Sequence, residues 1–193
     1  VGLTTLAYCA VSPDGCTLPN QIRLDRNTLP HLRVLTDAVH AQGAAVSAQI
    51  THGGCCTFIR APGQRRPLSA SGGLNKIGLM SGQSFKRQMS VADMQRVAAD
   101  FASGARLARE AGFDAVEIHM GHGYLLSQFL SPLYNKRRDE YGGSLDNRLR
   151  FPRQVLRQVL DAVGDDLAVI CKYSITEGVR GGNGIAEGVG IAR

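Results

Sequence analysis

The stretch Gly112–Arg150, GFDAVEIHMGHGYLLSQFLSPLYNKRRDEYGGSLDNRLR, decides how the rest of the chain is interpreted. Its apolar run Ala115–Ile118 has the composition of a buried strand, and a polar cluster with His119, His122 and Tyr124 follows directly. A long loop rich in charge and glycine then leads to the start of a helix. Two histidines three residues apart, with a tyrosine two residues further on, predict a site that meets a small molecule.

Working outward from this stretch, apolar runs and amphipathic runs alternate along the chain. Besides the run already quoted, apolar composition predicts strands at Leu3–Ala10, Ala44–Ile50 and Leu167–Lys172. Helical spacing of apolar residues, together with caps and terminal glycines, predicts helices at about Leu29–Gln42, from Ser90 to Gly112, from Ser144 to Gly164, and again from Ile185 onward. Ser90 with Asp93 has the pattern of a capping box.

This alternation predicts right-handed βαβ units and a parallel sheet. No Gly-x-Gly-x-x-Gly motif follows the first strand, so the strongest marker of a Rossmann domain is missing. Polar residues instead follow the strands, at Gln49 and His52, at His119–Tyr124 and at Lys172–Glu177. Because TIM barrels gather their active sites at the C-terminal ends of the strands, the predicted fold is α/β, a partial TIM (β/α)8 barrel. We expect residues 1–193 to form one incomplete domain, cut from a longer polypeptide.

Bulk composition excludes several classes of function. The chain is 44% hydrophobic and 20% charged, as in ordinary globular proteins, with no run of about 18 apolar residues and no signal peptide. No nucleic-acid-binding motif accompanies the net charge of +6. Arg148, Arg150, Arg153 and Arg157 alternate with apolar residues, which predicts a solvated helix face. The five cysteines lack metal-ligand spacing, which favours a reducing, cytoplasmic setting.

The segment Val116–Phe151 closely resembles the old yellow enzyme family of FMN-dependent NAD(P)H:flavin oxidoreductases. The shared pattern is His-x-x-His-Gly-Tyr, then Phe-Leu-Ser-Pro, Asn-x-Arg-x-Asp-Glu-Tyr-Gly-Gly-Ser and Asn-Arg. Weaker similarity extends over Val1–Arg193, through AQITHGG and ITEGVRGGNGI. The resemblance implies an incomplete FMN-binding barrel that spans roughly the second to fifth strands of eight. It also implies that NAD(P)H reduces FMN, and that FMN then reduces the C=C bond of α,β-unsaturated carbonyl compounds.

The resemblance gives the polar cluster its catalytic roles. Two imidazole N–H groups can hold a carbonyl oxygen, and the family implies this role for His119 and His122. A phenol can protonate a forming carbanion, and the family implies this role for Tyr124. The alternatives are a packing role for one histidine and a loop-bracing role for the tyrosine. A zinc site made by His52, His119 and His122 is conceivable, although no carboxylate is obviously placed as a fourth ligand.

Two further residues are implied in cofactor binding. Gln49 ends a strand, and its amide offers the donor and acceptor that a flavin pyrimidine edge requires. Lys172 ends an apolar strand, where a buried ammonium group needs a partner. The family usually has Arg or Lys at this position, beside the flavin N1 and C2 carbonyl. The alternatives are a capping amide for Gln49 and, for Lys172, an ion pair with Glu177 or another carboxylate.

The chain also departs from the family pattern. Cys55 and Cys56 follow the His-Gly-Gly sequence where many members have Arg, and Tyr8 stands where a small residue is common, so the pocket is expected to differ in shape. In the motif from Asn135 to Gly143, pairing of Arg137 or Arg138 with Asp139 or Glu140 is expected to hold the loop in place.

The leading hypothesis is a flavin-dependent ene-reductase that acts on a small enone-type molecule, without a nucleic-acid or membrane partner. Whether it forms a homo-oligomer is left open. Two alternatives remain. One is a Schiff-base lyase or aldolase with Lys172 as nucleophile and Tyr124 as its acid–base partner. The other is a non-catalytic half-barrel that binds no cofactor and persists only through a partner.

Overall fold

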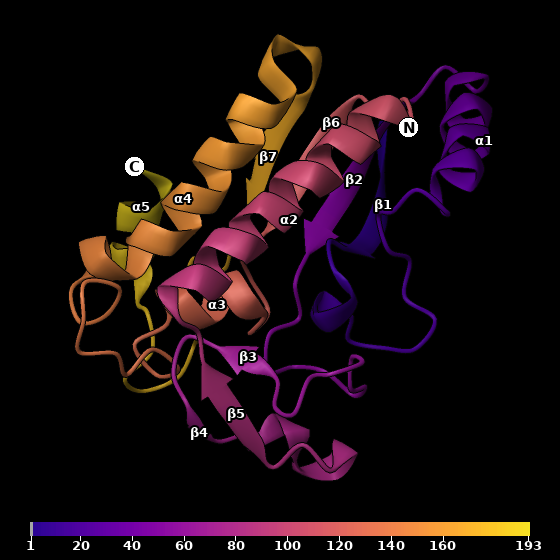
Figure 1. Ribbon diagram of the computed structural model, residues 1–193. Coiled ribbons are helices and arrows are strands. Elements are labelled where there is room, and N and C mark those ends of the chain that lie inside the picture. Colours follow the sequence, from indigo (N-terminus) through magenta and orange to yellow (C-terminus); the bar gives the residue numbers. More distant parts are fainter. Residues whose placement is uncertain (1) are drawn as a thin grey trace.

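The structure is a computed structural model that describes residues 2–193. Four parallel strands form its main sheet: β1 (Leu3–Ala10), β2 (Ala45–Thr51), β6 (Ala115–His119) and β7 (Ala168–Lys172). Their order in the sheet is β1-β2-β6-β7, which is also their order along the chain (Figure 1). A doubly wound sheet reverses this order at a switch point, whereas a barrel does not. The predicted partial α/β barrel is therefore confirmed.

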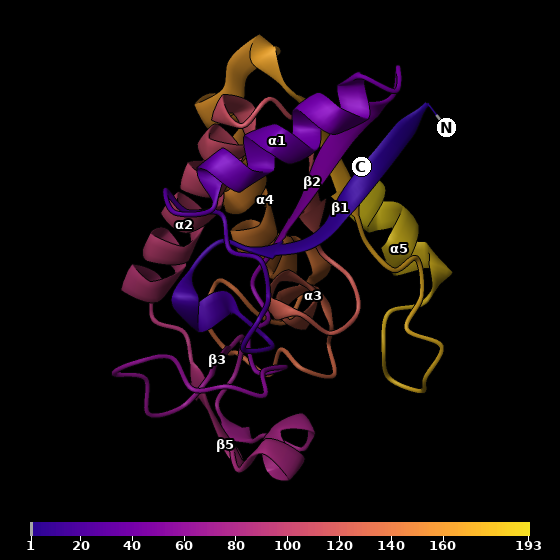
Figure 2. The same ribbon diagram turned by 90° about the vertical axis from the view of Figure 1, so that its right-hand side faces the viewer.

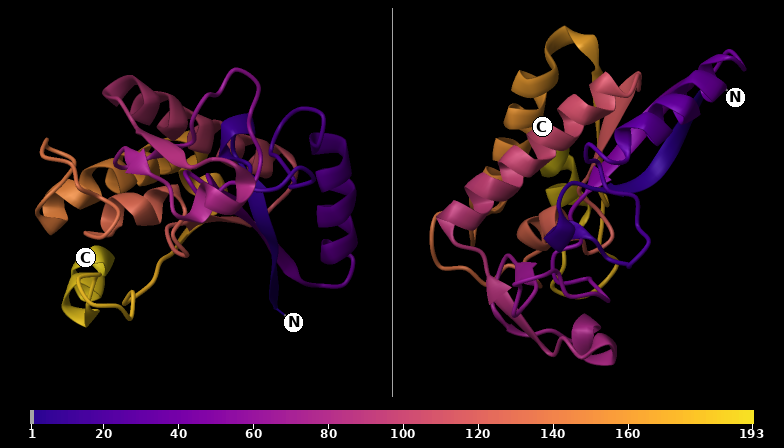
Figure 3. Two further views of the ribbon diagram at one scale, coloured as in Figure 1. Left: turned by 90° about the horizontal axis from the view of Figure 1, so that it is seen from below. Right: turned by 45° about the vertical axis from the view of Figure 1, so that its right-hand side comes forward.

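Helices connect these strands and cover one face of the sheet. They are α1 (Leu29–His40), α2 (Val91–Glu110) and α4 (Leu145–Val163), and α5 (Ile185–Ala192) follows β7. Figures 1 and 2 show α2 and α4 side by side across the sheet. The core lies between helices and strands, where Ile50 and Ile118 pack with Phe101 and Val155 and are fully buried. Seen from below, α1 and α5 lie on opposite sides of the molecule (Figure 3, left).

The predicted helix starts and ends agree closely with the structure. The Ser90 side chain accepts a hydrogen bond from the Asp93 N–H, and the Asp93 carboxylate accepts one from the Ser90 N–H, which completes the predicted capping box. Ser144 caps α4 in the same way by accepting from the Asn147 N–H, and Gly164 follows its last residue. None of the helices in residues 2–193 is both long enough and apolar enough to cross a membrane.

Several short elements were not predicted. Between β2 and α2, three short strands form a second sheet in the order β3-β5-β4: β3 (Leu68–Ser69), β4 (Gly73–Leu74) and β5 (Phe85–Gln88). The short helix α3 (Leu125–Leu130) follows β6. Figure 1 shows these elements beyond the carboxyl ends of the main strands. They therefore surround the region where the polar residues were expected.

The predicted solvated face of α4 is only partly correct. Arg150, Arg153 and Arg157 are exposed, but Arg148 is buried. The Arg148 guanidinium donates to the Asn183 Oδ1 at 2.8 Å and to the Leu130 carbonyl. This side chain ties α4 to the loop before α5, a contact between distant segments that helical spacing does not reveal.

Candidate active site

Strand alternation places four polar side chains on one face of the main sheet. Gln49 lies opposite Glu117 across the β2–β6 pair, and His119 lies opposite Lys172 across the β6–β7 pair. Ile118, between Glu117 and His119, is fully buried on the side of the helices. Because successive side chains of a strand point to opposite faces, these four point away from α2 and α4. In a barrel, this face is the interior.

The two predicted histidines are in contact. His119 Nε2 and His122 Nδ1 are 3.1 Å apart, and the two rings are nearly perpendicular. His119 Nδ1 accepts a hydrogen bond from the Gly121 N–H, so in the neutral ring the proton is on Nε2 and is donated to His122. His122 Nδ1 is then the acceptor, which leaves the Nε2–H of His122 available to a ligand. The arrangement is a short chain of donors, with His122 as the outer member.

Burial keeps the inner histidine neutral. His119 is 2% exposed, and burial, followed by the positive charges of His122 and Lys172, lowers its pKa to about 4. At neutral pH it is therefore a hydrogen-bond donor and not a cation. The backbone of His122 has a φ of 55°, in the left-handed region that residues other than Gly rarely adopt. This conformation turns the loop after β6 back towards His119.

Tyr124 lies beside the histidine pair, immediately before α3. Its ring centroid is 5.1 Å from that of His119 and 5.4 Å from that of Tyr8. Burial and a hydrogen bond with Tyr8 raise the pKa of Tyr124, so the phenol keeps its proton at neutral pH. The Tyr8 hydroxyl is 2.9 Å from the Thr17 Oγ1. His119, His122 and Tyr124 therefore form one cluster, to which Tyr8 adds a second phenol.

The two predicted cofactor-binding residues differ in their surroundings. Gln49 is 4% exposed, and its Nε2 donates to the Glu117 Oε1. Lys172 is exposed because β7 is an edge strand of the sheet, so the expectation of a buried ammonium group is wrong. Within residues 2–193, Lys172 forms no ion pair, and the Glu177 carboxylate instead accepts from the Asn183 N–H at 2.7 Å. The alternative Lys172–Glu177 ion pair is not formed.

The zinc alternative is not supported by the geometry. His52 is buried in a separate network, where its Nδ1 accepts from the Gly54 N–H and its Nε2 lies 3.7 Å from the Asp14 Oδ1. Across the described part of the chain, no three His, Cys, Asp or Glu side chains are grouped to hold a metal ion. His52 therefore does not belong to the cluster that contains His119 and His122.

The sequence pattern does not predict the contacts of two residues in this site, Glu117 and Cys56. Glu117 was included in an apolar strand, although its position two residues before His119 indicates the same face. Cys56 was noted only as a departure, yet its Sγ donates to the Gly123 carbonyl at 3.0 Å. The Gln128 amide donates to the same carbonyl at 2.7 Å. These two contacts hold the turn between His122 and Tyr124.

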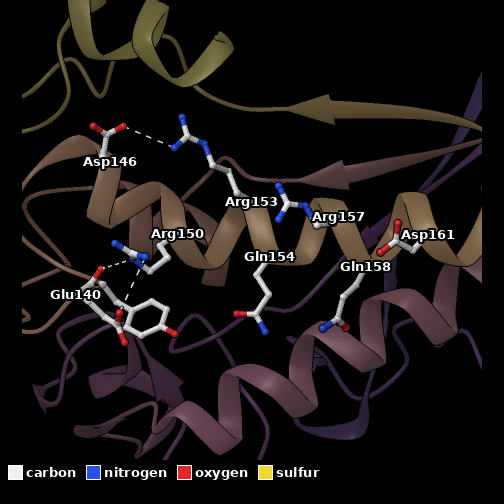
Figure 4. A pocket seen from close by; sticks show the side chains of 9 residues that line it. Glu140, Asp146, Arg150, Arg153, Gln154, Arg157, Gln158 and Asp161 are labelled. Atoms are coloured by element: carbon white, nitrogen blue, oxygen red, sulfur yellow. Dashed lines mark hydrogen bonds and ion pairs between the residues drawn. The ribbon is translucent and has the colours of Figure 1, made fainter.

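An open hollow of about 570 Å³ lies elsewhere, on the outer surface of α4 (Figure 4). Two of its arginines contact neighbouring acceptors: Arg153 lies 3.6 Å from the Asp146 carboxylate, and Arg150 donates to the Glu140 carbonyl at 2.9 Å. The hollow is on the helix side of the sheet, so it is separate from the His119 cluster, which lies at the strand ends.

Two solved structures with the same fold are a reductase and an old yellow enzyme. A 2-naphthoyl-CoA reductase in complex with 2-naphthoyl-CoA matches 97% of this chain and 30% of its own, with a TM-score of 0.87 and 28% identity. The old yellow enzyme from Pichia sp. AKU4542 matches 95% of this chain and 50% of its own, with a TM-score of 0.84 and 27% identity. The fold is thus that of a barrel oxidoreductase.

The chain belongs to the NADH:flavin oxidoreductase / NADH oxidase family, whose model matches residues 1–192. This family works with FMN and with NADH or NADPH. The 4,4'-dithiodibutanoate disulfide reductase of Rhodococcus erythropolis is 42% identical over 193 residues, which are 99% of this chain and 46% of that protein. The chain therefore spans about half the length of this relative. Membership favours the flavin hypothesis over the Schiff-base alternative.

Proposed function

We propose that the protein uses NAD(P)H and bound FMN to reduce the C=C bond of α,β-unsaturated carbonyl compounds. The observation that carries this proposal is the contact between His119, His122 and Tyr124 at the end of β6. These groups lie at the end of the sheet face that also carries Gln49 and Lys172. We further propose that residues 1–193 form one domain of an FMN-binding barrel in a cytoplasmic protein.

The residues of this face fit a flavin ring. Gln49 Nε2 is engaged by Glu117, and within residues 2–193 the Gln49 Oε1 has no hydrogen-bond partner, so it can accept from an imide N–H. Lys172 offers an exposed positive charge on the same face, which suits the carbonyl edge of a pyrimidine ring. When bound, FMN supplies the hydride that NAD(P)H provides.

The residues of the chain then bind and protonate the substrate. The His122 Nε2–H donates to the substrate carbonyl oxygen, and His119 polarises His122 by donating to its Nδ1. Negative charge that develops on the carbonyl oxygen is stabilised by this chain of hydrogen-bond donors. Tyr124 holds a proton and delivers it to the carbon beside the carbonyl, which completes addition across the double bond.

A Tyr124→Phe variant of the full-length, FMN-loaded protein tests these roles. We expect alkene reduction to slow by about 10²-fold or more, because the proton donor is lost, while flavin reduction by NAD(P)H stays within about twofold of the wild type. Anaerobic stopped-flow absorbance of the flavin measures the two half-reactions separately.

Tyr141→Phe is the matched control, since Tyr141 lies in the loop before α4 and should affect neither half-reaction. Equal slowing of both half-reactions in Tyr124→Phe would contradict the assignment of Tyr124 as a proton donor to substrate.

A second candidate function is reduction of an organic disulfide, which the 42% identical relative favours by its name. A hydride from NAD(P)H, passed on through bound FMN, would convert one sulfur to a thiol and cleave the S–S bond, and Tyr124 would protonate the departing thiolate. Assays of the same loaded protein with 4,4'-dithiodibutanoate and with a cyclic enone distinguish the candidates, because the true substrate class will give the higher kcat/KM.

A further inference from the structure

Glu117 is the one carboxylate on the interior face of β6, and it contacts a proposed cofactor-binding residue. It lies directly opposite Gln49 in the parallel β2–β6 pair, and the Gln49 Nε2 donates to its Oε1. Gln49 is 4% exposed and Glu117 is half-buried. The contact joins adjacent strands of the sheet, so it does not depend on a loop.

The chemistry of this contact fixes the direction of the amide. An ionised carboxylate only accepts hydrogen bonds, so the NH₂ group of Gln49 must face Glu117 and its oxygen must face the other way. Without such a neighbour, a glutamine amide can turn either its NH₂ group or its oxygen towards a ligand. Gln49 is therefore an acceptor towards a ligand, and a matching ligand must bring an N–H group.

We propose that Glu117 is a positioning residue that holds the Gln49 oxygen towards the flavin ring, so that the site requires a free imide N–H at flavin N3. This inference rests on the proposed FMN binding. It assigns a role to a residue that does not itself touch the cofactor. It also explains why an acidic side chain interrupts an otherwise apolar strand, Ala115–His119, beside Gln49.

The test compares FMN with N3-methyl-FMN, in which this N–H is absent. The full-length apoprotein is titrated with each flavin, and quenching of flavin fluorescence gives the two dissociation constants. We expect wild-type protein to bind FMN about tenfold more tightly, since N3-methylation removes one hydrogen bond and sets a methyl group against the Gln49 oxygen. In Glu117→Gln, whose side chain no longer fixes the amide direction, the ratio should fall towards one.

Two further variants keep the test decisive. Gln49→Leu removes the acceptor and should lose the preference for FMN to the same extent, even if Glu117→Gln folds poorly. Glu140→Gln is the matched control, because Glu140 is exposed in the loop before α4, and it should keep the wild-type ratio. Retention of the full preference in Glu117→Gln or in Gln49→Leu would overturn the inference.

The same titration separates the inference from the proposed function. Equal affinity of the wild-type protein for both flavins would overturn the role of Glu117 and leave FMN binding intact. Failure of the wild-type protein to bind either flavin would overturn both.

Discussion

Burial makes His119 a neutral donor, and this has a consequence for stability. Its pKa in the folded protein is about 4, below the value of about 6.5 for a free histidine. Between these values the unfolded chain binds more protons, so the free energy of unfolding decreases as the pH falls through this window. At neutral pH and above, the full contribution of the buried neutral ring is present.

We predict that His119→Gln flattens this pH dependence. The free energy of unfolding of the wild type should fall between pH 6.5 and pH 4, with a contribution from His119 of up to about 1.4 kcal/mol per pH unit. Urea denaturation at a series of pH values measures the slope. His31→Gln, in which an exposed histidine is replaced, should leave the slope unchanged. An unaltered slope in His119→Gln would show that His119 is solvated.

At the scale of single residues, the sequence predicts the grouping of His119, His122 and Tyr124 better than it predicts the surroundings of this cluster. His119, His122 and Tyr124 are close in sequence and follow a strand, so local structure alone brings them together. The exposure of Lys172 and the contact of Glu117 with Gln49 depend on which strands are neighbours. Such facts belong to the sheet and cannot be derived from one strand.

At the scale of helices and strands, the length of an element determines whether the sequence predicts it. The four main strands and their connecting helices extend over enough turns or alternations for a period to show, and their observed ends agree to within a few residues. The two-residue strands β3 and β4 and the six-residue α3 are too short to show a period. Tertiary contacts determine their structure, including the bonds from the Arg137 side chain to the Ala70 and Met89 carbonyls.

The loop before α4 gives the prediction at this scale. Arg137 is buried, and its guanidinium makes two hydrogen bonds to the Asp139 carboxylate, at 2.9 and 2.6 Å, as the motif predicted. Asp139→Ala should lower the free energy of unfolding by about 1–2 kcal/mol, because a buried cation loses its partner while the carboxylate side itself is half-exposed.

Denaturant titration measures this loss. Glu140→Ala is the control, because the Glu140 carboxylate lies 4.0 Å from Arg150 at the surface and its removal should change stability by less than about 0.5 kcal/mol. Similar losses in both variants would mean that the Arg137–Asp139 pair adds no more than an exposed one.

For the whole molecule, the edges of the main sheet matter most. Among residues 2–193, β7 and all but the end of β1 are paired on one side only, and most residues of both strands are exposed or half-buried. We predict that residues 1–193 expressed alone associate through these edges, since unpaired strand backbones recruit further strands. Light scattering after size exclusion should show species larger than the 20.7 kDa monomer.

A proline variant tests the edge directly. The Ala168 N–H donates to the Asp114 carbonyl in the sheet, so the next N–H, that of Val169, points to the open edge. Val169→Pro should reduce association without breaking the β6–β7 ladder. A monomer in the unaltered chain, or unchanged association in the variant, would argue against edge pairing.

The left-handed backbone at His122 restricts how this site can diversify. Apart from glycine, only asparagine, aspartate and histidine adopt such a conformation with any ease. Of these four, only histidine and asparagine keep a side-chain N–H for a neutral oxygen ligand. We therefore expect few residue types at position 122 in natural or laboratory variants that still bind the oxygen atom of a ligand. Broader substrate ranges should arise instead from changes in the surrounding loops.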